Sequence, residues 1–385
     1  MTCPPKLLYF VSEDWYFVSH RLALAQAAKS AGFDVVVAAR VDRHGDAIRD
    51  AGMRLIPIDF ARSGLHPWRE ARSMAQLMAL YRREAPDLVH NVAVKPVIYG
   101  SLAASRARAK GIVNALMGLG WVFSSDSPKA KTLRPFVGAA LRSALRGENT
   151  RTIVQNSDDA ALLIEQRLAP RDSVRLIRGS GVDPSHYMTG PPPEGPPLVV
   201  LPARLLAAKG VGEFIQAAAL LKAEGSNARF ALVGKPDELS PAAITPEELR
   251  RAVSSGHVEY WGWRTDMPQV LNAANIVCLP TFYGEGLPKV LLEAAASKRA
   301  IVATDVPGCR EIVIPGENGW LVPPRNVAAL AAALREAIAR PDLCIRYGEA
   351  GRARVEREFS LDAVVAQTVA VYRELVSGAD PRPSL

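Results

Sequence analysis

The sequence predicts an α/β protein with two Rossmann-like domains, each a parallel sheet covered by helices on both faces. Three observations support this prediction. Short apolar segments alternate with longer helical patterns, which is typical of strand–helix–strand units. The alternation stops at a proline-rich stretch and then starts again. The length of 385 residues exceeds what a single ordinary core organises, so two domains are expected.

The first half should form a domain over residues 1–188. Its short apolar runs predict strands at 6–11, 33–39, 53–57, 87–90, 111–116, 150–155 and 174–178. Segments with apolar residues at helical spacing predict helices at 16–31, 67–85, 96–108, 128–146 and 158–168.

Residues 189–197 contain five prolines and two glycines, so they cannot continue a helix or a central strand and are expected to be a linker. The second domain should span residues 198–358. Strands are expected at 198–202, 228–233, 258–261, 276–279, 300–303 and 320–322. Helices are expected at 211–221, 247–253, 267–274, 287–297, 327–339 and 342–357. Residues 359–385 should form a last helix, at 361–376, that packs back on the first domain, followed by a tail.

Composition indicates a globular chain, with 49% hydrophobic and 22% charged residues. No apolar run approaches the length of a membrane span, and the first apolar stretch is too short for a signal peptide. Four scattered cysteines without metal-ligand spacing favour reduced thiols and a cytoplasmic location. The net charge is +8, and residues 1–190 hold 26 lysines and arginines against 17 acidic residues, so an anionic partner is expected there.

The segment 280–295 organises the second domain. It follows the expected strand 276–279, passes a turn with Gly284 and Gly286, and continues as a helix in which Pro288 suits the first position. Unpaired N–H groups at such a helix start form an anion site. Glu285 lies in the turn and Glu293 lies in the helix. Two carboxylates beside an anion site suit a ligand that carries both phosphates and hydroxyls.

A second basic turn follows the strand 198–202, with Arg204 and Lys209 five positions apart. These two cations are placed to stabilise a diphosphate as it gains charge. The glycine pattern of dinucleotide-binding folds, the P-loop motif and metal-ligand spacings are all absent from the sequence, which disfavours those classes of site.

These motifs together resemble family 4 glycosyltransferases. The resemblance rests on Arg204 and Lys209, Glu285 and Glu293, and the segments 179–183, 305–308 with Glu311, and 316–319. It implies a GT-B fold with the two domains facing across a cleft, retention of anomeric configuration, a nucleotide-sugar donor and no essential metal. It also implies the following roles: Glu285 contacts the donor sugar, Glu293 the ribose, Arg204 and Lys209 the diphosphate, the backbone amides of Gly286 and Leu287 the phosphates, and Arg264 the base.

The first half narrows the resemblance. Residues 87–100 and 118–123 resemble bacterial enzymes of surface-polysaccharide and glycan assembly that extend sugars on a polyprenyl-diphosphate carrier. Many relatives have His-x-His here, but this chain has His90 followed by Val92. His90 is therefore either a donor-sugar contact or a structural residue, and Lys95 is the competing polar candidate.

Two further residues are assigned to the acceptor side. Asp14, in the loop after the first strand, either contacts the acceptor or caps a helix. His20, in the first helix, either faces the cleft or packs in the core.

Residues 128–146 form a basic amphipathic pattern. This helix either lies on the anionic inner face of the cytoplasmic membrane or packs its apolar stripe on the core with a basic outer surface.

The expected function is transfer of a hexosyl or N-acetylhexosaminyl group, with a UDP-sugar favoured as donor, to a lipid-linked saccharide. Two alternatives share this architecture: a nucleotide-sugar 2-epimerase and a non-catalytic nucleotide-sugar-binding protein. Nucleic-acid binding is disfavoured because no RNA-binding signature accompanies the basic half.

Overall fold

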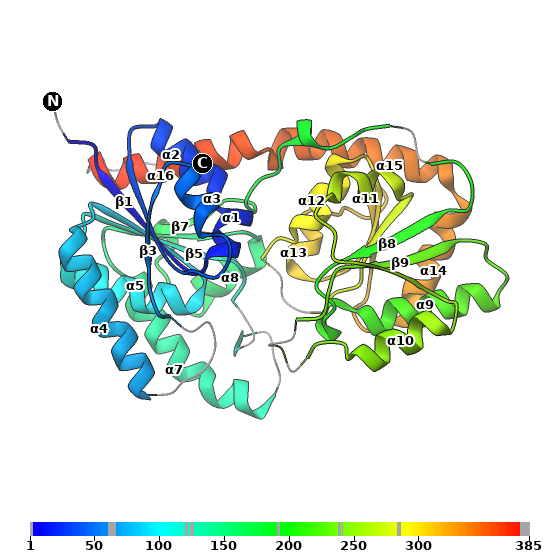
Figure 1. The fold of residues 1–385 in the computed structure, drawn as a ribbon, viewed down its shortest axis with the longest axis horizontal. Coiled ribbons are helices and arrows are strands. Elements are labelled where there is room, and N and C mark those ends of the chain that lie inside the picture. The colour runs from blue at the N-terminus through cyan, green and yellow to red at the C-terminus, as the bar shows by residue number, and fades with distance from the viewer. Residues whose placement is uncertain are drawn as a thin grey trace. The chain divides into compact units, whose positions relative to one another are not determined.

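A computed structural model of the protein describes residues 3–60, 67–119, 122–123, 127–190, 193–237, 240, 242–282 and 286–377. The chain forms two compact units (Figure 1). Unit 1 comprises Met1–Ser180 and Val364–Leu385, and unit 2 comprises Gly181–Ala363.

Unit 1 contains a seven-stranded sheet in the order β3-β2-β1-β4-β5-β6-β7, in which all paired strands are parallel. The strands are β1 (Lys6–Glu13), β2 (Asp34–Arg40), β3 (Arg54–Pro57), β4 (Leu88–Val92), β5 (Gly111–Leu116), β6 (Thr150–Val154) and β7 (Val174–Leu176). The seven strands expected from the sequence therefore match the strands of this sheet, with small shifts at their ends.

Helices cover both faces of the unit 1 sheet. They are α1 (Asp14–His20), α2 (Leu22–Ser30), α3 (Gly45–Asp50), α4 (Pro67–Glu84), α5 (Val94–Ala107), α7 (Pro128–Leu145), α8 (Ser157–Glu165), the short 3₁₀ turn η1 (Arg171–Ser173) and the last helix α16 (Leu361–Ser377). Buried side chains of α1, α2 and α16 share one core cluster, whereas those of α4, α5, α7 and α8 pack on the opposite face. Figure 1 shows α2 and α16 on one side of the sheet and α4, α5 and α7 on the other.

Unit 2 contains a six-stranded parallel sheet in the order β10-β9-β8-β11-β12-β13. The strands are β8 (Leu198–Pro202), β9 (Arg229–Val233), β10 (Glu259–Gly262), β11 (Ile276–Leu279), β12 (Ala300–Thr304) and β13 (Gly319–Val322). Its helical elements are η2 (Pro184–His186), η3 (Ala207–Lys209), α9 (Val211–Ala223), α10 (Pro246–Ser254), α11 (Met267–Ala273), α12 (Lys289–Ala296), α13 (Pro307–Arg310), α14 (Val327–Ala339), α15 (Pro341–Arg354) and the π-helical turn η4 (Val355–Phe359).

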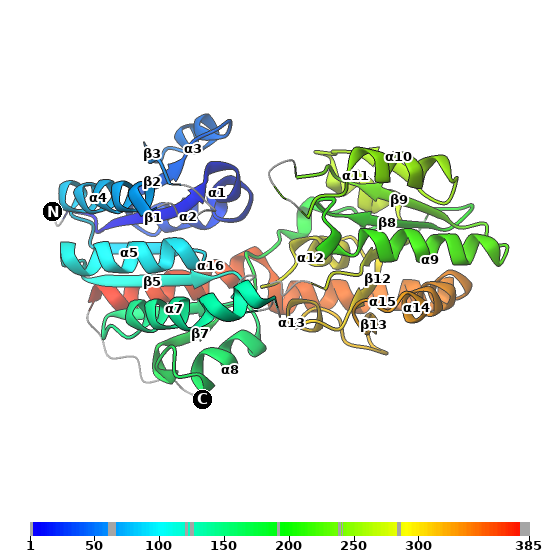
Figure 2. The ribbon, with the colours of Figure 1, turned by 90° about the horizontal axis from the view of Figure 1, so that it is seen from below.

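The strand β8 shows why this sheet needs helices on both faces. Leu198 and Val200 belong to the core beneath α11 and α12, whereas Val199 and Leu201 belong to the core beneath α9 and α14. Successive side chains of a strand point to opposite faces, so an unbroken apolar run must be covered twice. Figure 2 shows helices on both sides of the strands of unit 2.

The boundary between the two units lies earlier in the sequence than the proline-rich segment. The division falls between Ser180 and Gly181, whereas the sequence places a linker at residues 189–197. The proline-rich segment instead bonds within unit 2, because Arg299 donates to the carbonyl of Gly190 at 3.1 Å and Asn275 donates to that of Pro193 at 3.3 Å.

The chain leaves unit 2 beside the place where it enters. Val182 donates its backbone N–H to Phe359, and Leu361 donates to Val182, at 3.1 and 2.9 Å. Gly181 has a φ of +73°, and a Cβ there would lie 2.6 Å from the Cα of Leu361. Both the backbone conformation and the close contact require glycine, which explains the Gly179–Gly181 motif structurally.

The helix α16 is part of the unit 1 core from Val364 onward. Its Tyr372 is fully buried. Its Glu374 forms ion pairs with Arg151 of β6 and Arg175 of β7, the last two strands of the sheet. These contacts place the last helix from Val364 onward in unit 1.

Three details differ from the sequence expectation. The helix expected at 16–31 is divided into α1 and α2 at Arg21, and the six-residue helix α3 was not expected. The helix expected from residue 287 begins at Lys289, so Pro288 is its N-cap residue and not its first helical residue. None of the helices in the described part of the chain is long and apolar enough to cross a membrane.

Candidate active site

The polar motif residues of unit 2 follow neighbouring strands. Because β9, β8 and β11 are adjacent and parallel, the loops after them leave the sheet at one edge. In open α/β sheets this carboxyl edge is where ligands bind. The edge is therefore the place to test whether the separate motifs form one site.

The loop after β8 carries the two expected phosphate ligands. Arg204 donates from Nη1 to Oδ2 of Asp237, in the loop after β9, at 2.9 Å, and its side chain is 37% exposed. Lys209 is the last residue of the 3₁₀ turn η3, directly before α9. Asp237 was not singled out in the sequence, yet it orients one of the two cations.

The loops after β8 and β11 are joined directly. The hydroxyl of Thr281 and the backbone N–H of Phe282 both donate to the carbonyl of Ala208, each at 3.0 Å. Gly210 has a φ of +76°, and a Cβ there would lie 2.1 Å from the carbonyl oxygen of Pro280. Only glycine permits this contact. The structure thus brings the Arg204–Lys209 turn against the start of the segment 280–295.

The loop after β9 extends the same edge towards β10. Leu205 donates its backbone N–H to the carbonyl of Lys235 at 3.0 Å, and Gly234 donates to Gly262 at 2.8 Å. Hydrogen bonds therefore connect four consecutive loops, in the order in which their strands lie in the sheet.

Glu293 is a buried carboxylate and not a residue of a solvated helix face. It is 9% exposed, and Lys289, one helical turn earlier, lies 3.5 Å from its Oε1. Tyr187 hydrogen-bonds to Glu293, and burial together with this carboxylate raises the pKa of the Tyr187 hydroxyl. These partners fix a carboxylate that remains able to accept hydrogen bonds from hydroxyls.

The turn itself is described in part. Gly286 and Leu287 precede the helix α12, and Leu287 is buried beneath it. Glu285 lies outside the described residues, as do Tyr283 and Gly284. The role of Glu285 as a sugar contact stays a prediction.

The loop after β10 carries the expected base contact. Arg264 pairs with Asp266 at 2.7 Å, which raises the pKa of the guanidinium, and both side chains are well exposed. The neighbouring Trp263 is 61% exposed, and the ammonium of Lys235 lies 5.5 Å from its ring centroid. The aromatic ring and cation were not assigned from the sequence, although an exposed tryptophan at a strand end is a recognisable signal.

The segment 316–319 has a structural explanation. The side chain of Asn318 is buried, donates to the carbonyl of Ile312 at 2.9 Å and accepts from the N–H of Ile314 at 2.6 Å. It closes the turn that leads into β13, so this part of the motif shapes the fold and need not touch a ligand.

In unit 1 the side chains of the expected site residues contact other residues of the same unit. His90 is 1% exposed, stacks on Tyr9 at a centroid distance of 5.0 Å, and its Nδ1 lies 2.5 Å from the hydroxyl of Tyr372. Burial, and secondarily the charge of Arg21, holds the pKa of His90 well below its usual range. This is the position of a core residue, so of the two readings of His90 the structure favours the structural one.

Asp14 is fully buried and is bonded to the backbone of a neighbouring loop. Its Oδ2 accepts the backbone N–H groups of Asp42 and His44 at 2.9 and 2.8 Å. It is the first residue of α1, whose N-cap is Glu13. Asp14 therefore holds the loop between β2 and α3 and is not the helix cap, while its contact with the acceptor stays a prediction.

The two remaining acceptor-side residues also have partners. The His20 ring stacks on Tyr16 with centroids 4.4 Å apart and an angle of 5°. Lys95 pairs with Glu70 at 2.8 Å and lies 4.9 Å from the ring centroid of Phe60. Both side chains retain partial exposure, so an acceptor role stays a prediction for them.

The helix α7 packs much of its apolar stripe on unit 1. Leu141 and Leu145 are buried, and Val137 and Ala144 contact the same cluster. Phe136 is the exception, with 73% of its surface exposed. Among the described residues, no group of three or more His, Cys, Asp or Glu side chains is arranged to hold a metal ion.

Comparison with known proteins agrees with this arrangement. Residues 6–157 match the family described as "Glycosyl transferase 4-like", and residues 196–340 match "Glycosyl transferases group 1". The chain is a family 4-like glycosyltransferase of the GT-B fold. The two matches cover six of the seven strands of unit 1, β7 being outside them, and all six strands of unit 2 with their strand-end loops.

Several known proteins resemble this glycosyltransferase along most of its length. An N,N'-diacetylbacillosaminyl-diphospho-undecaprenol alpha-1,3-N-acetylgalactosaminyltransferase from Campylobacter jejuni is 27% identical over 81% of this chain and 83% of its own length. The putative glycosyltransferase EpsD of Bacillus subtilis is 26% identical over 95% and 96%. The crystal structure of Anabaena HepE with UDP and glucose shares the fold, with a TM-score of 0.76, 18% identity and coverage of 96% and 99%.

Proposed function

We propose that this glycosyltransferase moves a hexosyl or N-acetylhexosaminyl group from a nucleotide sugar to a lipid-linked saccharide, with retention of configuration and without an essential metal. A UDP-sugar is the favoured donor. The observation that carries the proposal is the hydrogen-bonded junction at Ala208. It brings two basic residues, the start of a helix and a buried carboxylate to one edge of unit 2.

The proposed reaction needs stabilisation of charge on the leaving diphosphate. Arg204, Lys209 and the backbone N–H groups of Gly286 and Leu287 supply it, since preorganised donors aimed at developing charge are a large term in catalysis. The bond from the anomeric carbon to the diphosphate oxygen breaks, and the acceptor oxygen forms the new bond. A phosphate oxygen of the leaving group takes the acceptor proton, while Glu285 orients the sugar.

The remaining donor contacts follow the sheet order. Glu293 would accept the ribose hydroxyls, with Tyr187 and Lys289 holding its carboxylate. Trp263, two strands from Arg204, would offer its exposed face to the base, with Arg264 beside it. Neighbouring strands lie about 4.8 Å apart, so the two-strand separation of roughly 10 Å suits a nucleoside diphosphate.

The lipid-linked acceptor is supported by the relatives and by charge. The Campylobacter jejuni relative is named for transfer to a diphospho-undecaprenol-linked sugar, and UDP occupies the Anabaena structure. The excess of basic residues in the first half suits an acceptor that carries a diphosphate.

A screen of UDP- and GDP-sugars, each with a polyprenyl-linked saccharide, tests the function through release of nucleoside diphosphate. Acceptor-dependent release is expected for a UDP-sugar, and it should persist in EDTA. The anomeric configuration of the product, read by NMR, tests retention. Donor converted to an epimer without acceptor would identify a 2-epimerase, and binding without turnover would identify a sensor.

We also propose peripheral attachment to the inner face of the cytoplasmic membrane through α7. Phe136, Lys129, Lys131 and Arg142 are all exposed on this helix, and Lys129 lies two turns before Phe136 on the same face. Such a helix suits an anionic interface at about 1 kcal/mol per cation. Flotation with phosphatidylglycerol vesicles tests the attachment, and an absence of binding at moderate salt would refute it.

A further inference from the structure

Two basic side chains are buried in the described part of the chain, Arg21 at 4% exposure and Arg299 at 1%. Charged side chains are almost never buried unless a partner compensates them. Arg299 precedes β12, at the amino edge of the unit 2 sheet, and donates to the carbonyl of Gly190 and to the amide oxygen of Asn272, both at 3.1 Å. Arg21 belongs to unit 1 and lies at the opposite kind of edge.

The guanidinium of Arg21 reaches the carboxyl end of β5, and such edges of parallel sheets are where ligands bind. Arg21 stands at the break between α1 and α2. Its Nη2 donates to the sulfur of Met117, the residue directly after β5, and its Nη1 lies 3.5 Å from the carbonyl oxygen of His20. Its Nε is buried and has no hydrogen-bond partner. A thioether is a weak acceptor and the carbonyl is at the limit of hydrogen-bond distance, so the guanidinium is poorly satisfied.

The surroundings of Arg21 do not supply a compensating charge. Its charge affects the pKa values of Tyr9, Tyr372 and His90, which are therefore its electrostatic neighbours. Burial raises the pKa of both tyrosine hydroxyls and lowers that of the imidazole, so all three side chains are neutral near pH 7. Within the residues that the structure describes, Arg21 forms no ion pair with a carboxylate.

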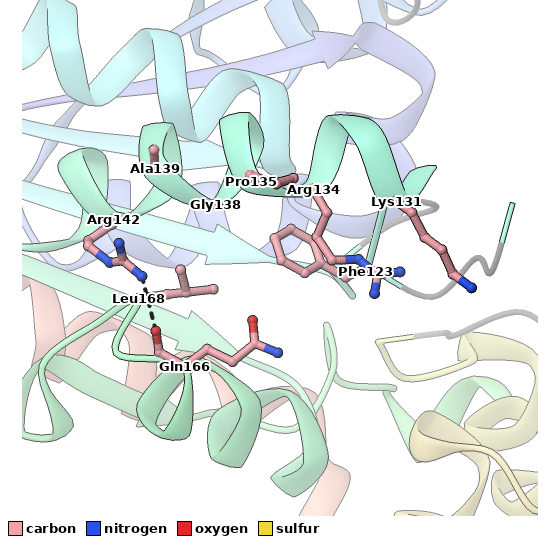
Figure 3. Close-up of a pocket in the computed structure, with 9 residues that line it drawn as sticks. All are labelled: Phe123, Lys131, Arg134, Pro135, Gly138, Ala139, Arg142, Gln166 and Leu168. Atoms are coloured by element: carbon pink, nitrogen blue, oxygen red, sulfur yellow. Dashed lines mark hydrogen bonds between the residues drawn. The ribbon is translucent and has the colours of Figure 1, made fainter. Parts of the chain in front are cut away.

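Burial distinguishes Arg21 from the cations beside α7. Figure 3 shows Arg142 of that helix at the edge of a groove, where it donates to the carbonyl of Gln166 at 3.2 Å. Arg142 is exposed, so water solvates its charge and an added anion would gain little there. Arg21 has almost no contact with water. An anion beside it would interact much more strongly, because opposite charges attract more where the dielectric constant is low.

We propose that Arg21 binds a phosphate of the lipid-linked acceptor, with a phosphate oxygen replacing the sulfur of Met117 at Nη2. Met117 is partly exposed, and its unbranched side chain is flexible enough to move aside. Guanidinium N–H groups pair well with phosphate oxygens. The identity of the ligand rests on the proposed function, in which a diphosphate is the anion of the acceptor. The site itself rests on the burial of Arg21 and on its missing counter-charge.

Arg21→Met separates this role from a structural one. It should raise the acceptor KM roughly 10–100-fold, the loss of one hydrogen-bonded charge, and leave the donor KM unchanged. The melting temperature should rise, because an unpaired buried charge disfavours folding. Arg151→Met is the matched control, since Arg151 is paired with Glu374 and is 15% exposed. Its replacement should lower the melting temperature and leave the acceptor KM unchanged.

Farnesyl diphosphate gives a direct binding test, with saturating UDP present to occupy the donor edge of unit 2. The compound should raise the melting temperature of the wild type and of Arg151→Met but not of Arg21→Met. Arg21→Lys keeps the charge without the planar fork, so its shift should be intermediate. This variant and the wild type keep the test valid if Arg21→Met does not fold. Glucuronic acid, tested in the same way, shows whether a sugar carboxylate is bound instead.

Three results would overturn the proposal: an unchanged acceptor KM in Arg21→Met, equal farnesyl diphosphate shifts with and without Arg21, or an Arg21-dependent shift with glucuronic acid alone. Acceptor-dependent donor turnover is measured in the same variants. If turnover is present but insensitive to Arg21, the phosphate site fails alone. If farnesyl diphosphate binding depends on Arg21 but no turnover occurs, the proposed function fails alone.

Discussion

The carboxyl edges of the two sheets use their polar residues in opposite ways. In unit 2, Arg204 and the residues around Thr281 are held by neighbouring loops, and 37% of the Arg204 side chain stays exposed. In unit 1, Asp14 and His90 are buried and bonded to residues of their own unit. The difference teaches that a strand-end polar residue is a ligand candidate only when its partners leave part of it exposed.

The largest effect is expected from replacing Lys209, which tests whether the edge of unit 2 is catalytic. Lys209→Ala should lower turnover by about 100-fold or more, because it removes a preorganised charge from the leaving diphosphate. The measurement is nucleoside diphosphate release at saturating donor. Arg250→Ala, on the exposed face of α10, is the control and should leave turnover unchanged. Near wild-type turnover in Lys209→Ala would remove the basis for a catalytic edge in unit 2.

The corresponding test in unit 1 is Asp14→Ala. It leaves the buried N–H groups of Asp42 and His44 without their acceptor, which should cost about 2–4 kcal/mol of unfolding free energy. The effect is measured by urea denaturation, with Asp50→Ala on the exposed side of α3 as control. The acceptor KM of the folded variant should not change. A raised acceptor KM with full stability would make Asp14 a ligand contact.

The burial of His90 predicts that the free energy of unfolding depends on pH. Its folded-state pKa lies well below the unfolded value of about 6.5. Below pH 6.5 the imidazole is therefore protonated in the unfolded chain but stays neutral in the folded chain. Stability contributed by neutral His90 is therefore present above pH 6.5 and is lost as pH falls below it, by up to about 1.4 kcal/mol per pH unit. His90→Phe should remove this slope and leave turnover near the wild-type value. Loss of turnover with the slope intact would make His90 a sugar contact after all.

The fold could be predicted from the sequence, because short unbroken apolar runs such as 198–202 are typical of strands covered by helices on both faces. The break between α1 and α2 was not accessible, since apolar spacing continues past Arg21. The short helix α3 was missed because six residues carry too little periodicity.

Site residues divide in the same way. Arg204 and Lys209 could be predicted as neighbours at one sheet edge because they follow the same strand closely in sequence. The surroundings of His90 were not, because its partner Tyr372 lies 282 positions away in the last helix. A distant partner decides whether a polar residue is buried, and a single sequence does not show which distant residues meet.

The smallest effect is expected at Trp263, in the loop after β10, the outermost strand of unit 2 on this side of the sheet. Trp263 is exposed beside Lys235 and is proposed to stack on the donor base. Stacking of a base on an aromatic side chain is worth about 1–3 kcal/mol, so Trp263→Ala should raise the donor KM roughly tenfold with little change in kcat. Trp263→Phe should restore most of the affinity, because it keeps an aromatic face.

The matched control for this prediction is Trp68→Ala. Trp68 is 82% exposed at the start of α4 in unit 1, so its removal deletes a similar area of exposed aromatic surface without touching the donor edge. A donor KM that rises equally in both variants would mean that the effect is not local to the edge. A donor KM that rises only in Trp263→Ala would extend the donor site across four neighbouring loops of unit 2. That outcome would also separate the site's two tasks, since affinity for the base would reside at Trp263 and stabilisation of the leaving diphosphate at Lys209.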